Sequence, residues 1–379
     1  MLYQTHVQVH LGNIRHNIES IKKTVGNDCK VLIAVKADAY GHGAVEVSRM
    51  AEKIGVDWLA IATVPEGIEL RDAGIKLPML KLSPAFPEEM EAAIENDITL
   101  CVCEESNIRL YNKTAQAMGR KATVHLQLDT GMGRIGANPE EGLRLAEIIL
   151  NDCHNLILQG VMTHLPVSDE SNESGKSFTR IQIDKFKNGV DKIEKTLNFK
   201  FPIVHCSNSA AITAYPDAKL DMVRPGIVVY GFYPSDEVPM TLDLKPGLSF
   251  KTCVSFVKKL AKGQSVGYGR TWIAPEDTWI ATFPAGYADG FNRLLSNKGR
   301  VLINGKSCPV VGRICMDQAM CSLGTGDTTD IKPGDEVVLI GRQGNEEITV
   351  EEWAKKLDTI TYEITCQINK RVKRYYDAY

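Results

Sequence analysis

Eight short apolar runs alternate with helix-like stretches through the first 230 residues, and this alternation restricts the possible folds more than any other feature. Alternating strands and helices build parallel sheets, and eight of each is the count of a (β/α)8 barrel. A doubly wound sheet is the alternative, but no GxGxxG motif follows the first run. We therefore predict a (β/α)8 barrel. The expected strands are residues 31–35, 58–62, 78–82, 98–102, 122–128, 156–162, 202–205 and 222–230, and the expected helices are residues 44–54, 65–73, 88–95, 105–118, 140–150 and 177–197.

The pattern changes after about residue 231, where short β-rich runs separated by Gly and Pro replace the helical periodicity. A chain of 379 residues also exceeds the usual size of one domain. We expect a (β/α)8 barrel in residues 1–238 and a mostly β domain in residues 239–379, with the first ten or so residues packing on the β domain. The expected elements of this second domain are strands at 248–257, 280–283, 300–303, 308–311 and 336–340 and one helix at 350–356.

Composition excludes several classes of function. A net charge of −3 is close to neutral, which argues against a nucleic-acid groove or an anionic membrane as partner. No run reaches the ~18 apolar residues of a membrane span, and the N-terminus lacks the pattern of a secretory signal. The ten cysteines form no CxxC pair, which argues against a zinc site. We expect a reduced cytoplasmic protein without a metal.

The stretch VLIAVKADAYGHG, residues 31–43, is the first candidate for chemistry. Lys36 follows the apolar run, at the expected end of a buried strand. Burial disfavours a charged lysine and lowers its pKa, which is what a Schiff-base lysine needs. The alternative is an ordinary strand-end lysine whose amine reaches water.

Reactive groups also follow four later strands, and barrel enzymes carry their catalytic groups at such ends. Taken singly, each has a simple structural alternative: His164 as a satisfied strand-end histidine, Asn208 as a helix N-cap, and Arg224 as the partner of a core carboxylate. Together they favour one site. Ser209 and Gly226 lie in the last two loops, where barrels often bind phosphate through backbone N–H groups. A phosphate site opposite a reactive lysine indicates pyridoxal 5'-phosphate. The groups are Asp129, Arg134, Thr163, His164, His205, Asn208, Ser209, Arg224 and Gly226.

Eight motifs along the chain resemble those of the bacterial alanine racemases, pyridoxal-phosphate enzymes with a barrel followed by a β domain. The resemblance extends from the N-terminal helix to RVKRYY near the C-terminus. It implies a homodimer with shared active sites that interconverts L- and D-alanine and supplies D-alanine for peptidoglycan. The motifs are AVKADAYGHG, LDTGMGRIG, HCSNSAA, MVRPGI, VGYG, GYADGF, VGRICMDQ and TITYE.

The resemblance also implies a role for individual residues. Lys36 and Tyr268 match the two opposed catalytic bases, with Tyr268 entering from the second subunit. Arg224 matches the arginine that faces the pyridine nitrogen. The cofactor-binding positions are Lys36, Tyr40, His164, Asn208, Ser209, Arg224, Gly226, Ile227 and Tyr362; the substrate-binding positions are Arg134, Met316 and Asp317; and the entry corridor contains Asp169, Tyr287, Arg293 and Arg313.

Two departures from the family pattern concern the substrate. Many members carry a carbamylated lysine where this chain has Gln127, an amide that can hydrogen-bond Arg134 but holds no charge. Leu165 and Pro166 replace other residues beside His164. A racemase that prefers serine or another small amino acid is therefore an alternative. Less favoured are a barrel-type decarboxylase, which expects a carboxylate in place of Arg224, and a cofactor carrier, which lacks the β domain.

Overall fold

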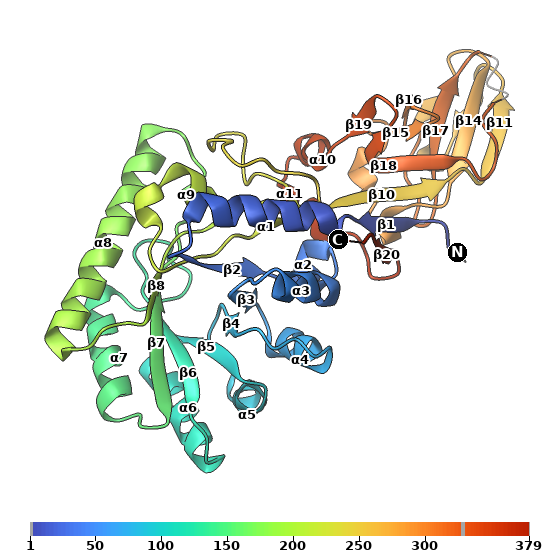
Figure 1. Ribbon diagram of the computed structural model, residues 1–379. Coiled ribbons are helices and arrows are strands. Elements are labelled where there is room, and N and C mark those ends of the chain that lie inside the picture. Colours follow the sequence, from blue (N-terminus) through green and yellow to red (C-terminus); the bar gives the residue numbers. More distant parts are fainter. Residues whose placement is uncertain (1–2, 327–329, 379) are drawn as a thin grey trace. The chain divides into compact units, whose positions relative to one another are not determined.

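The computed structural model describes residues 3–326 and 330–378 and is shown in Figure 1. The chain divides into two compact units. The barrel unit comprises Asn13–Ala39 and Gly43–Lys245. The β unit comprises the described parts of Met1–Gly12, Tyr40–His42 and Pro246–Tyr379. The chain therefore passes from the barrel unit into the β unit and back again within a few residues of Lys36.

The barrel unit contains an eight-stranded parallel sheet in the order β8-β7-β6-β5-β4-β3-β2-β9. Backbone hydrogen bonds from Asp221 N to Val204 O (3.0 Å) and from Arg224 N to Ser207 O (2.9 Å) connect the two end strands. The sheet closes in this way, and the predicted (β/α)8 barrel is confirmed. Its strands are β2 (Lys30–Ala34), β3 (Trp58–Ile61), β4 (Met79–Lys81), β5 (Ile98–Val102), β6 (Ala122–Gln127), β7 (Leu156–Met162), β8 (Ile203–His205) and β9 (Met222–Val223).

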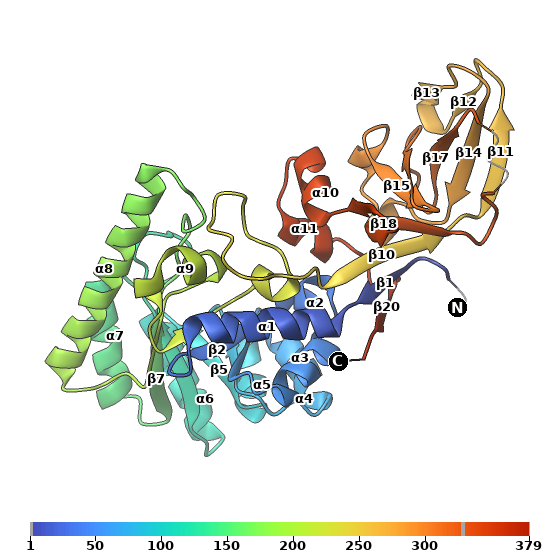
Figure 2. The ribbon, with the colours of Figure 1, turned by 45° about the horizontal axis from the view of Figure 1, so that its top comes forward.

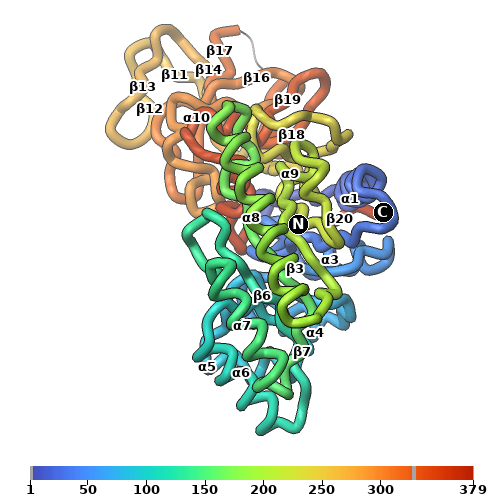
Figure 3. The backbone as a smooth tube through the Cα atoms, turned by 90° about the vertical axis from the view of Figure 1, so that its left-hand side faces the viewer, coloured from blue at the N-terminus to red at the C-terminus, as the bar shows by residue number. Residues whose placement is uncertain are grey.

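Helices follow the strands, and short polar side chains begin several of them. Thr63, Asn138 and Asn172 cap the helices after β3, β6 and β7 by accepting a backbone N–H of the first turn. Figure 3 shows α7 and α8 alongside each other on the outside of the barrel. None of the helices in the described ranges has the length and hydrophobicity needed to cross a bilayer. The helices are α1 (Leu11–Val25), α3 (Ala44–Lys53), α4 (Val64–Asp72), α5 (Pro87–Glu95), α6 (Glu105–Ala117), α7 (Pro139–Asn151), α8 (Glu173–Leu197) and α9 (Ser209–Ala214).

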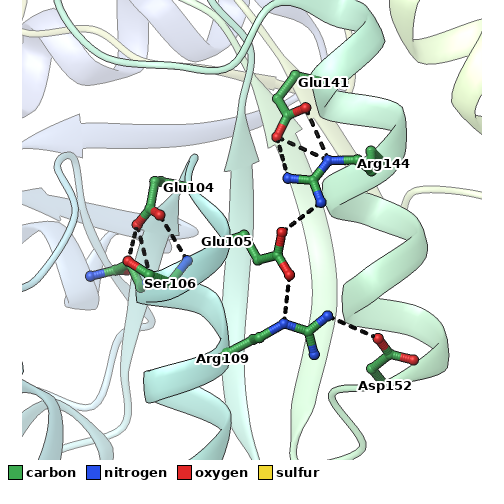
Figure 4. A network of polar contacts seen from close by, with 8 residues as sticks. Glu104, Glu105, Ser106, Arg109, Glu141, Arg144 and Asp152 are labelled. Atoms are coloured by element: carbon green, nitrogen blue, oxygen red, sulfur yellow. Dashed lines mark hydrogen bonds and ion pairs between the residues drawn. The ribbon is translucent and has the colours of Figure 1, made fainter.

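A surface network of charges connects α6 to α7 (Figure 4). Arg144 contacts Glu105 Oε2 at 2.5 Å and Glu141 Oε1 at 2.6 Å. Arg109 contacts Glu105 Oε1 at 2.7 Å and Asp152 Oδ2 at 3.1 Å. All these groups face water, where ion pairs add little stability, so this network contributes little to the free energy of folding.

The β unit has a main sheet in the order β16-β15-β18-β10-β1-β20, with β19 paired to β18. The N-terminal strand β1 lies between β10 and β20, as Figure 1 shows. A second sheet has the order β11-β14-β17, and Figure 2 shows the β12–β13 pair next to it. The strands are β1 (His6–Val9), β10 (Leu248–Cys253), β11 (Phe256–Leu260), β12 (Ser265–Val266), β13 (Trp272–Ile273), β14 (Thr278–Phe283), β15 (Arg300–Ile303), β16 (Lys306–Pro309), β17 (Ala319–Gly324), β18 (Glu336–Gln343), β19 (Glu346–Ile348) and β20 (Lys373–Tyr376), and the helices are α10 (Val350–Leu357) and α11 (Thr361–Cys366).

The structure corrects two expected strands. The apolar run 222–230 is not one strand: β9 ends at Val223, Pro225 has no N–H to donate, and Ile227–Tyr230 forms a 3-10 helix that ends at Gly231 in the left-handed region. The run 248–257 is divided between β10 and β11. The elements that were not predicted at all are the turn α2 (Lys36–Gly41), helix α11 and strands β12, β13, β17, β19 and β20.

We predict that Gly160→Ala destabilises the barrel. A Cβ atom at Gly160 on β7 would lie 2.7 Å from ring atoms of His125 on the neighbouring strand. Because both groups are enclosed, we expect the free energy of unfolding to fall by roughly 1–3 kcal/mol, measured by urea denaturation. Gly12→Ala is the control, since no atom lies within 4 Å of its Cβ position and alanine favours a helix. Equal stability of the two variants would contradict the prediction.

Candidate active site

The backbone after β2 forms a left-handed turn that begins next to Lys36. Residues 37–40 all have φ between 52° and 54°, although none of them is glycine. Each such residue costs about 1–2 kcal/mol relative to right-handed backbone, and residues of this kind normally occur singly. Backbone strain concentrates at functional sites, where the surroundings hold it in place. The turn therefore marks Lys36 independently of its residue type.

Asp38 helps to hold this turn. Its side-chain Oδ1 accepts a hydrogen bond from Ala44 N at 2.7 Å, and its carbonyl accepts one from Gly43 N at 2.9 Å. A further bond runs from Ala39 N to Val35 O at 2.8 Å. These bonds connect the turn to the end of β2 and to the start of α3.

Arg224 follows β9 and is a buried guanidinium. Its Nη2 donates to the carbonyls of Thr163 (2.6 Å) and Cys206 (3.1 Å), and its Nη1 lies 3.0 Å from His205 Nδ1. Nη2 also lies 3.4 Å from His164 Nδ1. Burial lowers the pKa of Arg224 to about 10, so it stays charged at neutral pH. Its partners are thus carbonyls and imidazoles, and the alternative of a paired core carboxylate is wrong.

A chain of two histidines continues from this arginine. Since a guanidinium only donates, His205 Nδ1 accepts and His205 Nε2 donates to His125 Nδ1 at 2.9 Å. His125 Nε2 in turn donates to Gln159 Oε1 at 3.3 Å. Burial lowers the pKa of His125 to about 4 and that of His205 well below its ordinary value, with Arg224 adding to both effects. Both rings are therefore neutral: His205 accepts a hydrogen bond from Arg224, and His125 accepts one from His205.

Three positive charges of the barrel unit act on His164, and the Nη2 of Arg224 lies 3.4 Å from its Nδ1. Burial lowers the pKa of His164 to about 3, and the positive charges of Arg224, Arg134 and Lys36 lower it further. These residues follow β7, β9, β6 and β2, respectively. The structure thus brings together one neutral imidazole and three cations that the sequence places up to two hundred residues apart.

Arg134 lies at the end of a glycine-rich loop that Asp129 organises. The Asp129 carboxylate accepts backbone N–H groups of Gly131 (2.9 Å), Met132 (2.9 Å) and Gly133 (3.0 Å). The amide of Gln127, which can hydrogen-bond Arg134, instead binds its strand and loop neighbours.

Within the described residues, Gln127 Nε2 donates to Ile135 O (3.3 Å) and Gln127 Oε1 accepts from the Cys101 thiol (3.2 Å). Neighbouring strand and loop atoms therefore use both ends of this amide.

The loops after β8 and β9 are connected by Ser209 and Gly226. The Ser209 hydroxyl accepts a hydrogen bond from Gly226 N at 2.8 Å, and the buried Ile227 follows. Asn208 accepts a hydrogen bond from Ala211 N, as its N-cap interpretation requires, and its Oδ1 also accepts one from Ser168 Oγ at 2.9 Å.

The segment after His164 is anchored to the same region. Asn208 Nδ2 donates to the carbonyl of Leu165 at 2.9 Å, and the Leu165 side chain is buried. Asp169 accepts a hydrogen bond from Ser235 Oγ through its backbone carbonyl at 2.7 Å.

The β unit contains the other predicted residues. The rings of Tyr40 and Tyr362 lie 5.7 Å apart, and burial raises the pKa of the Tyr40 hydroxyl. Tyr268 is 73% exposed and lies between two glycines that both have φ of +71°. The Cβ position of Gly269 lies 3.3 Å from Arg313 Nε, so the Tyr268 turn packs on Arg313.

Two loops of the β unit are joined by backbone hydrogen bonds from Tyr287 N to Cys315 O and from Ala288 N to Met316 O, both at 3.0 Å. The positive charge of Arg293 acts on the thiol of Cys315 in the second of these loops.

Sequence reasoning missed the residues that hold these two loops. The buried carboxylate of Asp289 accepts from Arg371 Nε (2.7 Å) and from Gly286 N (2.9 Å). Arg371 Nη2 also contacts Asp317 Oδ1 at 2.7 Å. Both charged residues lie inside quoted motifs, Asp289 in GYADGF and Arg371 in RVKRYY. Their charge and their place in these motifs could have singled them out, but nothing in the spacing shows that they meet.

We predict that stability falls as the pH drops below neutral. His125, His164 and His205 are neutral in the folded chain because their pKa values lie well below 6.5, and they bind protons on unfolding. Their stabilisation is complete above the unfolded pKa of about 6.5 and is lost as the pH falls, by about 1 kcal/mol per histidine between roughly pH 6.5 and 5.5.

Urea unfolding at about pH 7.5, 6.5 and 5.5 measures this slope. His125→Gln removes one of the three groups, so the slope of its unfolding free energy against pH should be shallower by about one third. A slope that the variant leaves unchanged would contradict the prediction.

Comparison with known proteins shows the family to which the chain belongs. The family description "Alanine racemase, N-terminal domain" matches residues 9–234, and "Alanine racemase, C-terminal domain" matches residues 247–376. A protein of Cutibacterium acnes named alanine racemase is 50% identical over 98% of this chain and 97% of its own length. The solved alanine racemase of Clostridium difficile 630 is 42% identical, with a TM-score of 0.93 over 100% of this chain and 96% of that one. The same enzyme in complex with cycloserine is 41% identical, with a TM-score of 0.91 over 99% of this chain and 96% of that one. By sequence along both units and by fold, the chain belongs to the alanine racemase family.

Proposed function

We propose that this protein interconverts L- and D-alanine with pyridoxal 5'-phosphate as its cofactor. The observation that carries the proposal is that Lys36, Arg134 and Arg224 all act electrostatically on the neutral His164, with Arg224 Nη2 3.4 Å from its Nδ1. Together they supply a lysine amine for covalent attachment and two guanidinium groups for an anionic ligand. The names of the relatives, and the cycloserine complex among the solved structures, support the same reaction.

The residues present fit this cofactor. The Ser209 hydroxyl lies against the backbone amide of Gly226, so one hydroxyl and the N–H groups that follow would hold a phosphate. Lys36 would hold the aldehyde carbon through its amine, and Arg224 and His164 would lie beside the ring. When bound, the cofactor supplies an electron-withdrawing ring that makes the hydrogen on the substrate Cα acidic.

Two residues of the chain would move the proton. Racemisation removes a proton from one face of Cα and returns one to the other, so two groups must flank that atom. We assign these roles to Lys36 and Tyr268. Arg134 would hold the substrate carboxylate, and Asp129 would keep its loop in place by accepting three backbone N–H groups.

Arg224 would set the type of reaction. A guanidinium keeps its protons, so it disfavours a further proton on a ring nitrogen that faces it. Its buried partners are two carbonyls and neutral imidazoles, which leave its charge uncompensated. A decarboxylase of similar fold expects a carboxylate at this position, and Arg224 argues against that activity.

We propose a two-fold homodimer in which Tyr268 completes the site of the partner subunit. Three side chains assigned to the site are exposed in the single chain: Tyr268 by 73%, Met316 by 53% and Tyr287 by 43%. Large side chains left in water support an interface that covers them.

We also place the enzyme in the cytoplasm, as a source of D-alanine for peptidoglycan. Six of the ten cysteines are buried free thiols, which suits a reducing compartment: Cys29, Cys101, Cys153, Cys206, Cys308 and Cys321.

The first test measures racemisation of L-alanine, L-serine and L-lysine by the purified holoenzyme. We expect L-alanine to react at least ~10-fold faster than the other two, because the proposed substrate has a small apolar side chain and both alternatives carry larger, polar ones. Loss of activity in Lys36→Ala, with loss of covalent labelling after borohydride treatment, would support the lysine assignment. Preference for serine would overturn the substrate, and release of CO2 from lysine would indicate a decarboxylase.

A second test addresses the shared site. Lys36→Ala and Tyr268→Phe subunits are each expected to be inactive alone. Mixed and allowed to exchange, they should form hybrid dimers with one intact site, so activity should recover to about a quarter of wild type at equal amounts. Subunit exchange is verified separately by mass spectrometry with labelled chains. No recovery after verified exchange would contradict a site shared between subunits.

A further inference from the structure

One carboxylate connects the left-handed turn after Lys36 to the next β/α connection of the barrel. Glu66 lies in the first turn of α4, shortly after β3 ends. Its Oε1 accepts a hydrogen bond from Ala37 N at 2.8 Å. Its Oε2 accepts from Ala62 N at 2.7 Å and from Thr63 N at 3.2 Å. The single side chain thus binds three backbone N–H groups from two separate loops.

Capping of α4 accounts for only part of this arrangement. Thr63 Oγ1 accepts a hydrogen bond from Glu66 N at 3.3 Å, and Glu66 Oε2 accepts one from Thr63 N. These two bonds form a capping box. The bond to Ala37 lies outside the box. It binds the peptide group that joins Lys36 to Ala37, on a different β/α connection.

That peptide group lies beyond the last backbone hydrogen bond that β2 makes with its neighbouring strand. The last sheet-like bond before Lys36 runs from Val35 N to Ala60 O at 2.9 Å. From Ala37 onward the backbone is left-handed. Because a peptide unit is planar, fixing the Ala37 N–H also fixes the carbonyl and the Cα of Lys36. The peptide on the other side of Lys36 is held by its Val35 carbonyl, which accepts from Ala39 N at 2.8 Å, and the two peptides together set the direction of the Lys36 Cα–Cβ bond. Lys36 is thereby held from both sides.

We propose that Glu66 is a positioning residue for Lys36, holding the backbone on its carboxyl side so that the amine points into the site. The inference rests on the proposed function, in which Lys36 is the reacting lysine. A carboxylate is required, since its two oxygens serve two sets of N–H donors, whereas an amide has one acceptor oxygen and would face the other set with its own N–H groups.

The test compares Glu66→Gln and Glu66→Ala with Thr63→Ala in the holoenzyme. Thr63→Ala is the matched control, because it removes a capping bond of the same helix and leaves the bond to Ala37 in place. We expect the thermal midpoints of Glu66→Gln and Thr63→Ala to fall by similar amounts. Only the Glu66 variants should lose kcat, by about ten- to hundredfold, with KM changed less than about threefold, since a displaced lysine impairs the reaction more than substrate binding.

A second measurement does not depend on turnover. Each apoprotein is mixed with pyridoxal phosphate, reduced with borohydride at set times, and digested to quantify the label on Lys36. We expect labelling of Lys36 to be at least about tenfold slower in the Glu66 variants and unchanged in Thr63→Ala. If Glu66→Ala does not fold, Glu66→Gln carries the comparison.

Two results would overturn the proposal in distinguishable ways. Glu66 variants that match Thr63→Ala in kcat and in labelling rate would make Glu66 a helix cap only, with the function of Lys36 intact. Label on another lysine in the wild-type enzyme would instead reject the proposed function, and the positioning role with it.

Discussion

The closure of the barrel by two residues is the constraint on which the site depends. Met222 and Val223 pair with Lys30 and Val31 of β2, and the residues on either side of them bond to the backbone around β8. Asp221 adds a side-chain bond from Val204 N at 2.7 Å. Because the ring closes here, residues that follow the first strand of the barrel lie beside residues that follow the last. Lys36 and Arg224 become neighbours through this short piece of backbone.

The site gathers positive charge and balances it with dipoles. Carbonyl oxygens of Thr163 and Cys206 and the neutral ring of His205 surround the Arg224 guanidinium. A carboxylate in place of one of them would satisfy the arginine and also cancel its charge. Neutral imidazoles satisfy the hydrogen bonds of Arg224 without cancelling its charge. The surroundings of Arg224 therefore keep an attraction for anions, which suits a ligand that carries phosphate and carboxylate groups.

Much of the fold could be predicted because its signals are local. The buried parallel strands are apolar on both faces, and the helices begin with capping residues such as Asn138 and Thr63. Long-range and conformational features escaped prediction. Proline ended β9 early, the neighbours of Gln127 occupy the amide that can hydrogen-bond Arg134, and nothing in ADAY indicates a left-handed backbone. The Asp289–Arg371 pair joins motifs far apart in sequence, so only the folded chain shows it.

The left-handed run at residues 37–40 has a consequence for protein engineering. One rule for raising stability would place glycine wherever an L-residue has positive φ, since glycine relieves the steric conflict. Here that rule would select a segment of backbone that adjoins Lys36. Glycine has the widest conformational freedom, so the substitution would raise the conformational entropy of this segment in both the unfolded and the folded chain. A more heat-resistant version of this scaffold is better sought on the outer helices, and a D-amino acid introduced by chemical synthesis is the replacement that would relax this turn without freeing it.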